Sequence, residues 1–189
     1  MNKTKRLIFE TAMKLFAEKG YDGTSVQDIT DLAGVAKGTL YYHFSSKEEI
    51  FEFLVDEGMK LLENSIEIKI ANLDNSLDKL RAIVLIQIKI FYKYNDLMNI
   101  VLKDIWGTSA RSRLCQERVF QYVKKIEGIV KEGIEKGEII NNPPEVLAAG
   151  LVGSVASIYC YENSGNKKME VADLFKLVDK TYLKGLKKQ

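Results

Sequence analysis

Residue types that break helices or carry chemistry are scarce in this sequence. Its 189 residues include two prolines, two cysteines, one histidine and one tryptophan. The prolines, Pro143 and Pro144, are adjacent, so most of the chain is free of helix breakers. Cys115 and Cys160 fit no metal-binding or redox spacing, and we expect both to be reduced, partly buried cysteines of a cytoplasmic protein. The lone histidine, His43, cannot form a catalytic triad with any serine that the sequence singles out.

Motifs of common enzyme classes are also lacking. The sequence contains no HExxH, CxxC or GxGxxG, and the segment Gly150-Leu151-Val152-Gly153 lacks the lysine of a phosphate-binding loop. We therefore predict no catalytic residues, no metal and no cofactor. A helical enzyme remains an alternative, as does an adaptor that binds protein and has no DNA function.

The chain also lacks a strong excess of charge and a long apolar run. Lys and Arg number 28 against 26 Asp and Glu, a net charge of +2, so any affinity for DNA must come from local placement of charge. The longest uncharged run, Val146 to Tyr161, is shorter than the ~20 residues that a spanning helix needs, and we interpret it as a buried helix. Met1 to Arg6 lead into an amphipathic helix and not into a secretory signal. We expect no membrane partner.

Residues 26–44 are the most informative segment. Val26, Ile29 and Ala33 recur at the spacing of one helix face, and Gly34 then interrupts the pattern where glycine can end a helix. A second short run follows, with Leu40 and Phe44 four residues apart. Two short helices joined by a tight glycine turn form a helix-turn-helix, which places its second helix in the major groove of DNA.

The second of these helices directs unusual side chains outward. A solvated helix rarely carries two adjacent tyrosines, a histidine and an early glycine, whereas a helix against phosphates can use all of them. Some have an ordinary alternative, since the lysine could simply be solvated and one tyrosine could pack inward. The candidate DNA contacts on this helix are Lys37, Gly38, Thr39, Tyr41, Tyr42 and His43.

Three further candidates flank the two helices. Thr24 or Ser25 caps the first helix, Ser25 has capping-box spacing to Asp28, and a helix N-terminus can also hold a phosphate. Lys47 lies just beyond the second helix, where we expect a phosphate contact. Ser46 and Glu49 repeat the capping-box spacing and start the next helix.

These residues resemble the TetR family of bacterial transcriptional repressors over about Leu7 to Phe51. The resemblance rests on Ala12, Phe16, Gly20-Tyr21, Thr24-Ser25-Val26, Ile29, Ala33-Gly34-Val35, Lys37-Gly38-Thr39-Leu40-Tyr41-Tyr42-His43-Phe44 and Lys47-Glu48. The chain departs from many relatives at Ala36, where they carry serine or threonine ahead of the recognition helix. The resemblance implies a dimer with one recognition helix per chain, a ligand pocket in the C-terminal helices, and a fourth helix that moves when ligand binds. It also implies that the last two helices pair with the partner chain.

The rest of the sequence predicts an all-α protein of about nine helices. We expect an N-terminal three-helix, helix-turn-helix domain over residues 1–46, followed by a helical effector-binding and dimerisation domain over residues 47–189. The helix at about 77–94 is apolar on most sides, which is typical of the middle of a bundle. Gly58 falls within the fourth helix, either for close packing or as a bend. Asn163 to Asn166 is expected to form a turn.

Aromatic and soft residues between positions 77 and 136 could line an effector pocket, although such residues are usually core. We expect Phe91, Met98, Trp106 and Tyr122 in the lining, with Arg111 at the mouth of the pocket as an anchor for an anionic group of the effector. Such a pocket suits an acyl chain or acyl-coenzyme A, with an aromatic compound second.

Small and apolar residues near the C-terminus predict the dimer interface, although a contact within the chain would look the same. They are Gly150, Gly153, Leu174, Phe175 and Val178. Together these features predict a homodimeric repressor that binds an inverted-repeat operator and is released by a small apolar effector.

Overall fold

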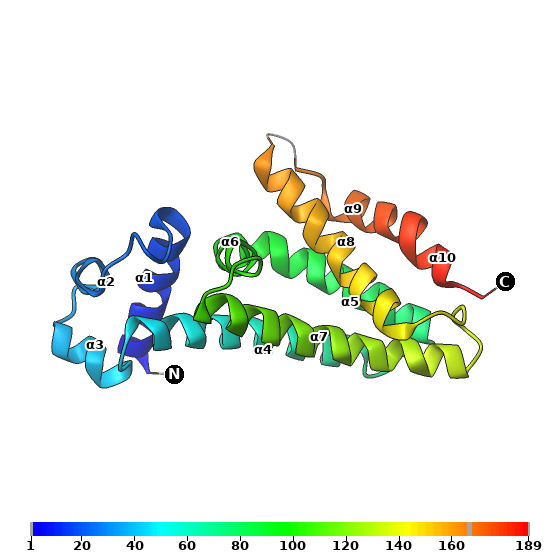
Figure 1. Cartoon of the computed structure of the whole chain (residues 1–189), viewed down its shortest axis with the longest axis horizontal. Coiled ribbons are helices and arrows are strands. Elements are labelled where there is room, and N and C mark those ends of the chain that lie inside the picture. The colour runs from blue at the N-terminus through cyan, green and yellow to red at the C-terminus, as the bar shows by residue number, and fades with distance from the viewer. Residues whose placement is uncertain (1, 166–167, 189) are drawn as a thin grey trace. The chain divides into compact units, whose positions relative to one another are not determined.

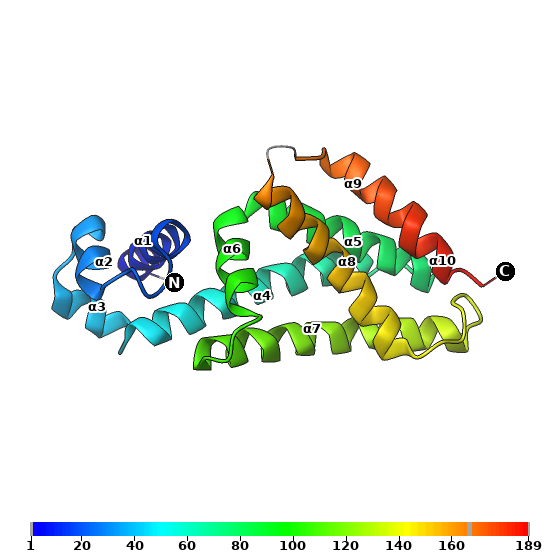
Figure 2. The same ribbon diagram turned by 45° about the horizontal axis from the view of Figure 1, so that its top comes forward.

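The computed structural model describes residues 2–165 and 168–188, which are helical throughout apart from turns and one isolated bridge between Ile139 and Lys187 (Figures 1 and 2). The all-α prediction is confirmed. The chain forms two compact units, and each is described by itself. The expected turn at Asn163 to Asn166 differs, because α8 continues to Ser164; Asn166 lies outside the described residues.

The first unit contains residues up to Met59 together with Tyr94–Gln116. It holds three helices from the N-terminal segment, the beginnings of α4 and α7, and all of α6. Their bounds are α1 (Lys3–Lys19), α2 (Val26–Ala33), α3 (Lys37–His43), α4 (Lys47–Ile70), α6 (Asn95–Asp104) and α7 (Ala110–Glu135). The helices α4 and α7 each continue into the second unit.

Local capping explains where the early helices begin and end. Ser25 and Asp28 form the predicted capping box at the start of α2, each accepting a hydrogen bond from the other's backbone N–H. Gly34 ends α2 at φ 64°, the left-handed conformation that favours glycine. At the start of α4, Ser46 Oγ accepts from the backbone N–H of Glu49, but the Glu49 carboxylate accepts from Ser45 instead of Ser46.

The core of the first unit includes more of the chain than the sequence suggested. Leu40 and Phe44 of α3 are buried together with Leu97 and Ile100 of α6 and Cys115 of α7 in one apolar cluster. The compact unit therefore extends beyond the expected 1–46 domain, because α6 and the first turns of α7 complete its core. Gly58 has a packing role here, since a Cβ at this position would overlap the Leu97 side chain.

The second unit contains Lys60–Lys93 and the chain from Glu117 onward. The helix α5 (Ser76–Lys93) contacts both α8 (Pro144–Ser164) and α9 (Val171–Val178), and ten of its residues are buried. Its position inside the bundle confirms the prediction from its apolar surface. A π-helical turn (Asp179–Leu183) and the short α10 (Lys184–Leu186) follow α9.

The helix α8 departs from the expectation of a buried helix. Among the described helices it is the one long and apolar enough to cross a membrane by length and composition, yet only 28% of that apolar window is buried. Leu151, Val155 and Tyr159 face inward, while Val146 and Tyr161 are exposed. Because the mostly buried core helix of a soluble protein also passes this test, one such helix is weak evidence for a membrane span.

Candidate DNA-binding site

The helix α3 directs most of the predicted contact residues toward solvent. Lys37, Gly38, Tyr41 and Tyr42 are exposed, and Tyr42 is 84% exposed. Leu40 is fully buried and holds the helix on the core. Both tyrosines therefore point outward, and the alternative in which one packs inward is excluded. Thr39 and His43 are half-buried, and the His43 ring lies 5.0 Å from that of Tyr42.

Gly38 has no packing reason to be a glycine. A Cβ built at this position meets nothing within 4 Å, and its φ is not positive. Glycine within a helix costs about 1 kcal/mol relative to alanine. Packing among the described residues therefore does not explain the glycine at this position.

The start of α3 is weakly stabilised. Ala36 occupies the N-cap position and makes no side-chain cap hydrogen bond, as its methyl group requires. The first turn carries no acidic residue either. The exposed N-terminus of this helix is consequently free of competing negative charge from its own first turn.

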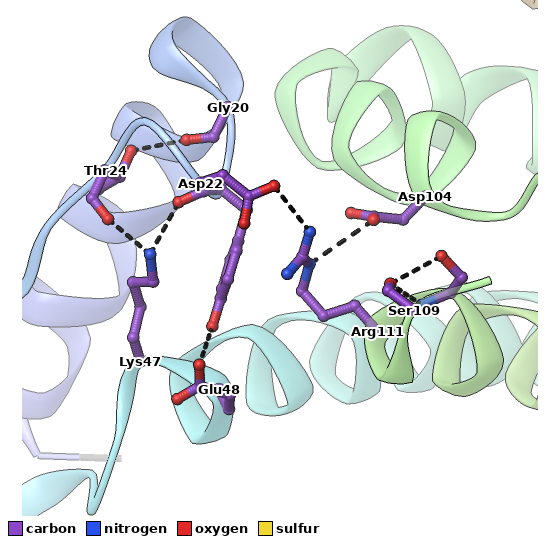
Figure 3. Close-up of polar contacts among 10 residues, drawn as sticks. Gly20, Asp22, Thr24, Lys47, Glu48, Asp104, Ser109 and Arg111 are labelled. Carbon is purple, nitrogen blue, oxygen red and sulfur yellow. Dashed lines mark hydrogen bonds and ion pairs between the residues drawn. The ribbon is translucent and has the colours of Figure 1, made fainter. Parts of the chain in front are cut away.

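Two predicted contact residues turn inward. Thr24 is 1% exposed, and its hydroxyl donates to the carbonyl oxygens of Gly20 (2.8 Å) and Leu15 (3.2 Å). The Lys47 ammonium donates to the carbonyl oxygens of Tyr21 and Thr24, at 2.9 and 2.7 Å (Figure 3). Both side chains thus hold the α1–α2 turn in place. Their motif positions gave no signal of this role, whereas Ser25 is exposed as expected.

Tyr21, to which the sequence assigned no contact, is the centre of this arrangement. Its ring is buried, and its hydroxyl donates to Glu48 Oε1 at 2.7 Å. Burial first, and this hydrogen bond second, raise the pKa of Tyr21. The same hydrogen bond is the main cause that lowers the pKa of Glu48. The Lys47 ammonium lies 4.1 Å from the centre of the Tyr21 ring, a cation–π contact.

Arg111, expected at the mouth of an effector pocket, lies against the same tyrosine. Its guanidinium carbon is 3.9 Å from the centre of the Tyr21 ring. Its Nη2 donates to Asp22 at 3.2 Å, and its Nε is 3.6 Å from Asp104 (Figure 3). Burial raises the pKa of Asp104, and the positive charge of Arg111 opposes that rise. Residues so far apart in sequence gave no pattern from which this cluster could be predicted.

The remaining effector candidates are distributed over both units. In the first unit, Met98 is half-buried and Trp106 is 87% exposed, so Trp106 lines no enclosed space within that unit. In the second unit, the Phe91 ring packs edge-on against Tyr159 at 5.3 Å. Tyr122 is buried, with its hydroxyl 3.4 Å from Gln87, a buried polar residue that sequence reasoning missed.

The candidate dimer residues divide into covered and open positions. Leu174 and Val178 are buried by the chain's own helices, so they cannot contribute to an exposed face. A Cβ at Gly150 would overlap the Tyr182 hydroxyl, which donates to Leu147 O at 2.8 Å. Gly150 is therefore needed for a contact within the chain. A Cβ at Gly153 meets nothing within 4 Å, and Phe175 is half-buried, so these two positions remain open.

Comparison with known families decides between a regulator and the alternatives. Residues 8–54 match the family described as bacterial regulatory proteins, tetR family, and residues 73–176 match the tetracyclin repressor-like, C-terminal domain. The chain belongs to the TetR family. A candidate regulator of fatty acid metabolism from Clostridium perfringens is 33% identical, with a TM-score of 0.88 over 95% of this chain and 98% of that one.

A curated relative agrees in class, and a further solved structure agrees in fold. The HTH-type transcriptional regulator YfiR of Bacillus subtilis, whose function is uncharacterised, is 26% identical over 87% of this chain and 78% of its own length. AibR, solved in complex with isovaleryl coenzyme A and operator DNA, is 24% identical with a TM-score of 0.79 over 96% of this chain and 99% of AibR. The chain is thus a DNA-binding transcriptional regulator of the TetR family and not an enzyme.

Proposed function

We propose that this TetR-family chain is a homodimeric repressor that binds an inverted-repeat operator through α3 and is released by an acyl-coenzyme A. The observation that carries the DNA contact is the exposed face of α3. Lys37, Gly38 and Tyr42 are solvent-facing and have no role in the core, while the N-terminus of α3 lacks acidic residues. Such a surface suits a groove lined by phosphates.

The α8 surface supports a homodimer. Its outward positions follow helical spacing and are small or apolar, at Val146, Ala149, Gly153, Ser157 and Cys160. Small residues allow another helix to approach closely, and obligate dimer interfaces are large and apolar. With Tyr161 also 84% exposed, this face fits the partner's copy of the same helix.

The effector proposal rests on relatives and on the chemistry of the second unit. A candidate regulator of fatty acid metabolism and a complex with isovaleryl coenzyme A are among the similar structures. The second unit offers an apolar interior with Phe91 and Tyr122 and one buried amide at Gln87. An apolar lining with few polar anchors suits an acyl chain. A 100-fold loss of operator affinity needs a differential of ~2.7 kcal/mol between the two states.

Titration of a labelled operator complex with acyl-coenzyme A tests this function. Fluorescence anisotropy reports release of DNA, and the single tryptophan, exposed Trp106, supplies a second signal. Stearoyl and isovaleryl coenzyme A serve as long-chain and short-chain probes, with an aromatic cation as the competing class. Release by either acyl compound supports the proposal. Release by the aromatic cation alone, or by none, contradicts the effector class.

A further inference from the structure

An arginine on α7 contacts the turn that joins α1 to α2. Arg111 is in the first turn of α7, where a positive charge opposes the helix dipole. It nevertheless stacks on Tyr21 and reaches Asp22, 89 residues away in sequence. Arg111 therefore does not stabilise α7 through the helix dipole, and its specific contacts are with Tyr21 and Asp22. We interpret these contacts as a role outside α7 itself.

The turn that Arg111 touches is tied to both helices that position the recognition helix. Ser25 at its end is the N-cap of α2. Lys47 in the first turn of α4 donates to the carbonyls of Tyr21 and Thr24, and Glu48 accepts from the Tyr21 hydroxyl. Tyr21 is therefore joined to the start of α4 by direct hydrogen bonds, and its carbonyl also accepts from the backbone N–H of Thr24, the residue before the N-cap of α2. Figure 3 shows Lys47, Glu48 and Thr24 around this turn.

The Arg111 contact is built so that it can be released. Its Nε is buried without a hydrogen-bond partner among the described residues, and the nearest carboxylate oxygen, on Asp104, is 3.6 Å away. Its other ionic partner, the Asp22 side chain, is 85% exposed, so water readily replaces that contact. The contact with the Tyr21 ring is thus the main restraint on Arg111, and the flat guanidinium can stack on that ring.

The helix α7 also extends through the unit proposed to bind effector. It is continuous from Ala110 to Glu135, and its residues from Glu117 onward belong to the second unit. Tyr122, one of the proposed effector contacts, lies three helical turns beyond Arg111. A shift of α7 along this length would carry Arg111 with it.

We propose that Arg111 is the positioning residue that couples effector occupancy to the DNA-reading helices, by holding or releasing Tyr21 and Asp22. The inference rests on the proposed function, because it concerns how that function is regulated. Coupling between two sites is reciprocal. If Arg111 couples them, operator binding must also change the structure or stability of α7. That reciprocity provides a test that requires no effector.

The test is hydrogen exchange of the full chain with and without an operator fragment. In the wild type, operator binding changes exchange of amides within residues 117–130 by at least threefold. In Arg111→Gln this change disappears, although the variant still binds operator. The matched control is Arg113→Gln on the same helix turn, whose side chain donates only to the Thr108 carbonyl among the described contacts. It retains the wild-type change.

A second variant keeps the test valid if Arg111→Gln misfolds. Asp22→Asn alters an exposed side chain and cannot unfold the core, and it reduces the exchange change partially. The double variant behaves as Arg111→Gln alone, because both substitutions remove one contact. In the wild type, stearoyl coenzyme A weakens operator affinity by a measurable factor. That factor is at least tenfold smaller in Arg111→Gln and less than twofold smaller in Arg113→Gln.

The two kinds of failure are distinguishable. A wild type that binds no DNA refutes the proposed function itself. A wild type that binds DNA while Arg111→Gln and Asp22→Asn keep the full change in α7 overturns the coupling role of Arg111. The same conclusion follows if wild-type operator binding leaves residues 117–130 unchanged.

Discussion

The Lys47 ammonium lies 2.7 Å from the carbonyl oxygen of Thr24, to which it donates a hydrogen bond. A second bond to the Tyr21 carbonyl makes this lysine a brace of the α1–α2 turn. We therefore predict that Lys47→Met lowers the free energy of unfolding by about 1.5–3 kcal/mol, the range for hydrogen bonds that involve a charged group. Urea denaturation measures it.

The matched control for Lys47 is Lys37, which is exposed on α3. Lys37→Met should leave the free energy of unfolding within about 0.5 kcal/mol of the wild type, as for other surface substitutions. It should weaken operator binding instead. Equal stability of the Lys47 variant and the wild type would show that the brace contributes nothing.

Gly38→Ala should separate stability from DNA binding. Because the site is open and helical, alanine should stabilise the chain by about 0.5–1 kcal/mol. The added methyl group should nevertheless reduce operator affinity if the backbone of α3 approaches DNA closely. Thermal unfolding and anisotropy titration on one preparation measure both effects. A variant that is more stable and binds with undiminished affinity would remove the close-approach argument.

Gly153→Arg tests the proposed dimer face. The substitution meets open space in the single chain and improves helix propensity, so the fold of the chain is retained. A charged side chain on an apolar interface should produce monomers in sedimentation velocity. Phe120→Arg is a control at an exposed aromatic on α7 outside this face, and it should remain dimeric. An intact Gly153→Arg dimer would place the interface elsewhere.

The capping box of α2 should make stability depend on pH in the acid range. The Ser25 hydroxyl first, and its backbone N–H second, hold the pKa of Asp28 below its ordinary value. Because the pKa of Asp28 is lower in the folded chain, its ionised carboxylate stabilises the fold at pH values above the unfolded pKa of about 3.9. This stabilisation is lost as the pH falls through the folded-state pKa.

Asp28→Asn removes that contribution. The free energy of unfolding of this variant should be lower than that of the wild type by a constant amount from about pH 7 to 5. The gap between the two should shrink below about pH 4. Ser25→Ala, which removes the cause of the shift, should show the same trend. A difference that is independent of pH would exclude Asp28 as the titrating group.

Periodicity and capping patterns were sufficient to predict the helices. The spacing of Val26, Ile29 and Ala33, with Gly34 at the end, located α2 because capping and turn formation depend on neighbours in sequence. The outward-facing residues of α3 were predicted in the same way. These signals depend on residues only a few positions apart, so they can be read from the sequence without knowledge of the tertiary structure.

Long-range contacts could not be read from the sequence. Arg111 and Tyr21 are 90 positions apart, and nothing in either segment indicates that the other is its partner. Likewise, an apolar helical stripe such as Leu174 and Val178 is the same whether the chain's own core or a partner covers it. The inward orientation of Thr24 depends on the carbonyl oxygens of Leu15 and Gly20, which accept from its hydroxyl. Their positions follow from the folded end of α1 and not from the residues next to Thr24.

Selection of a random DNA library by the full-length chain, followed by measurement of the stoichiometry of the selected complex, tests the regulator proposal most directly. We predict an inverted repeat whose half-sites are separated by one helical turn, ~10–10.5 bp, or a multiple of it, with an even number of chains bound. Affinity should fall steeply with salt, as expected when lysines neutralise phosphates. Enrichment of no sequence, or of a single asymmetric half-site bound by one chain, would contradict it.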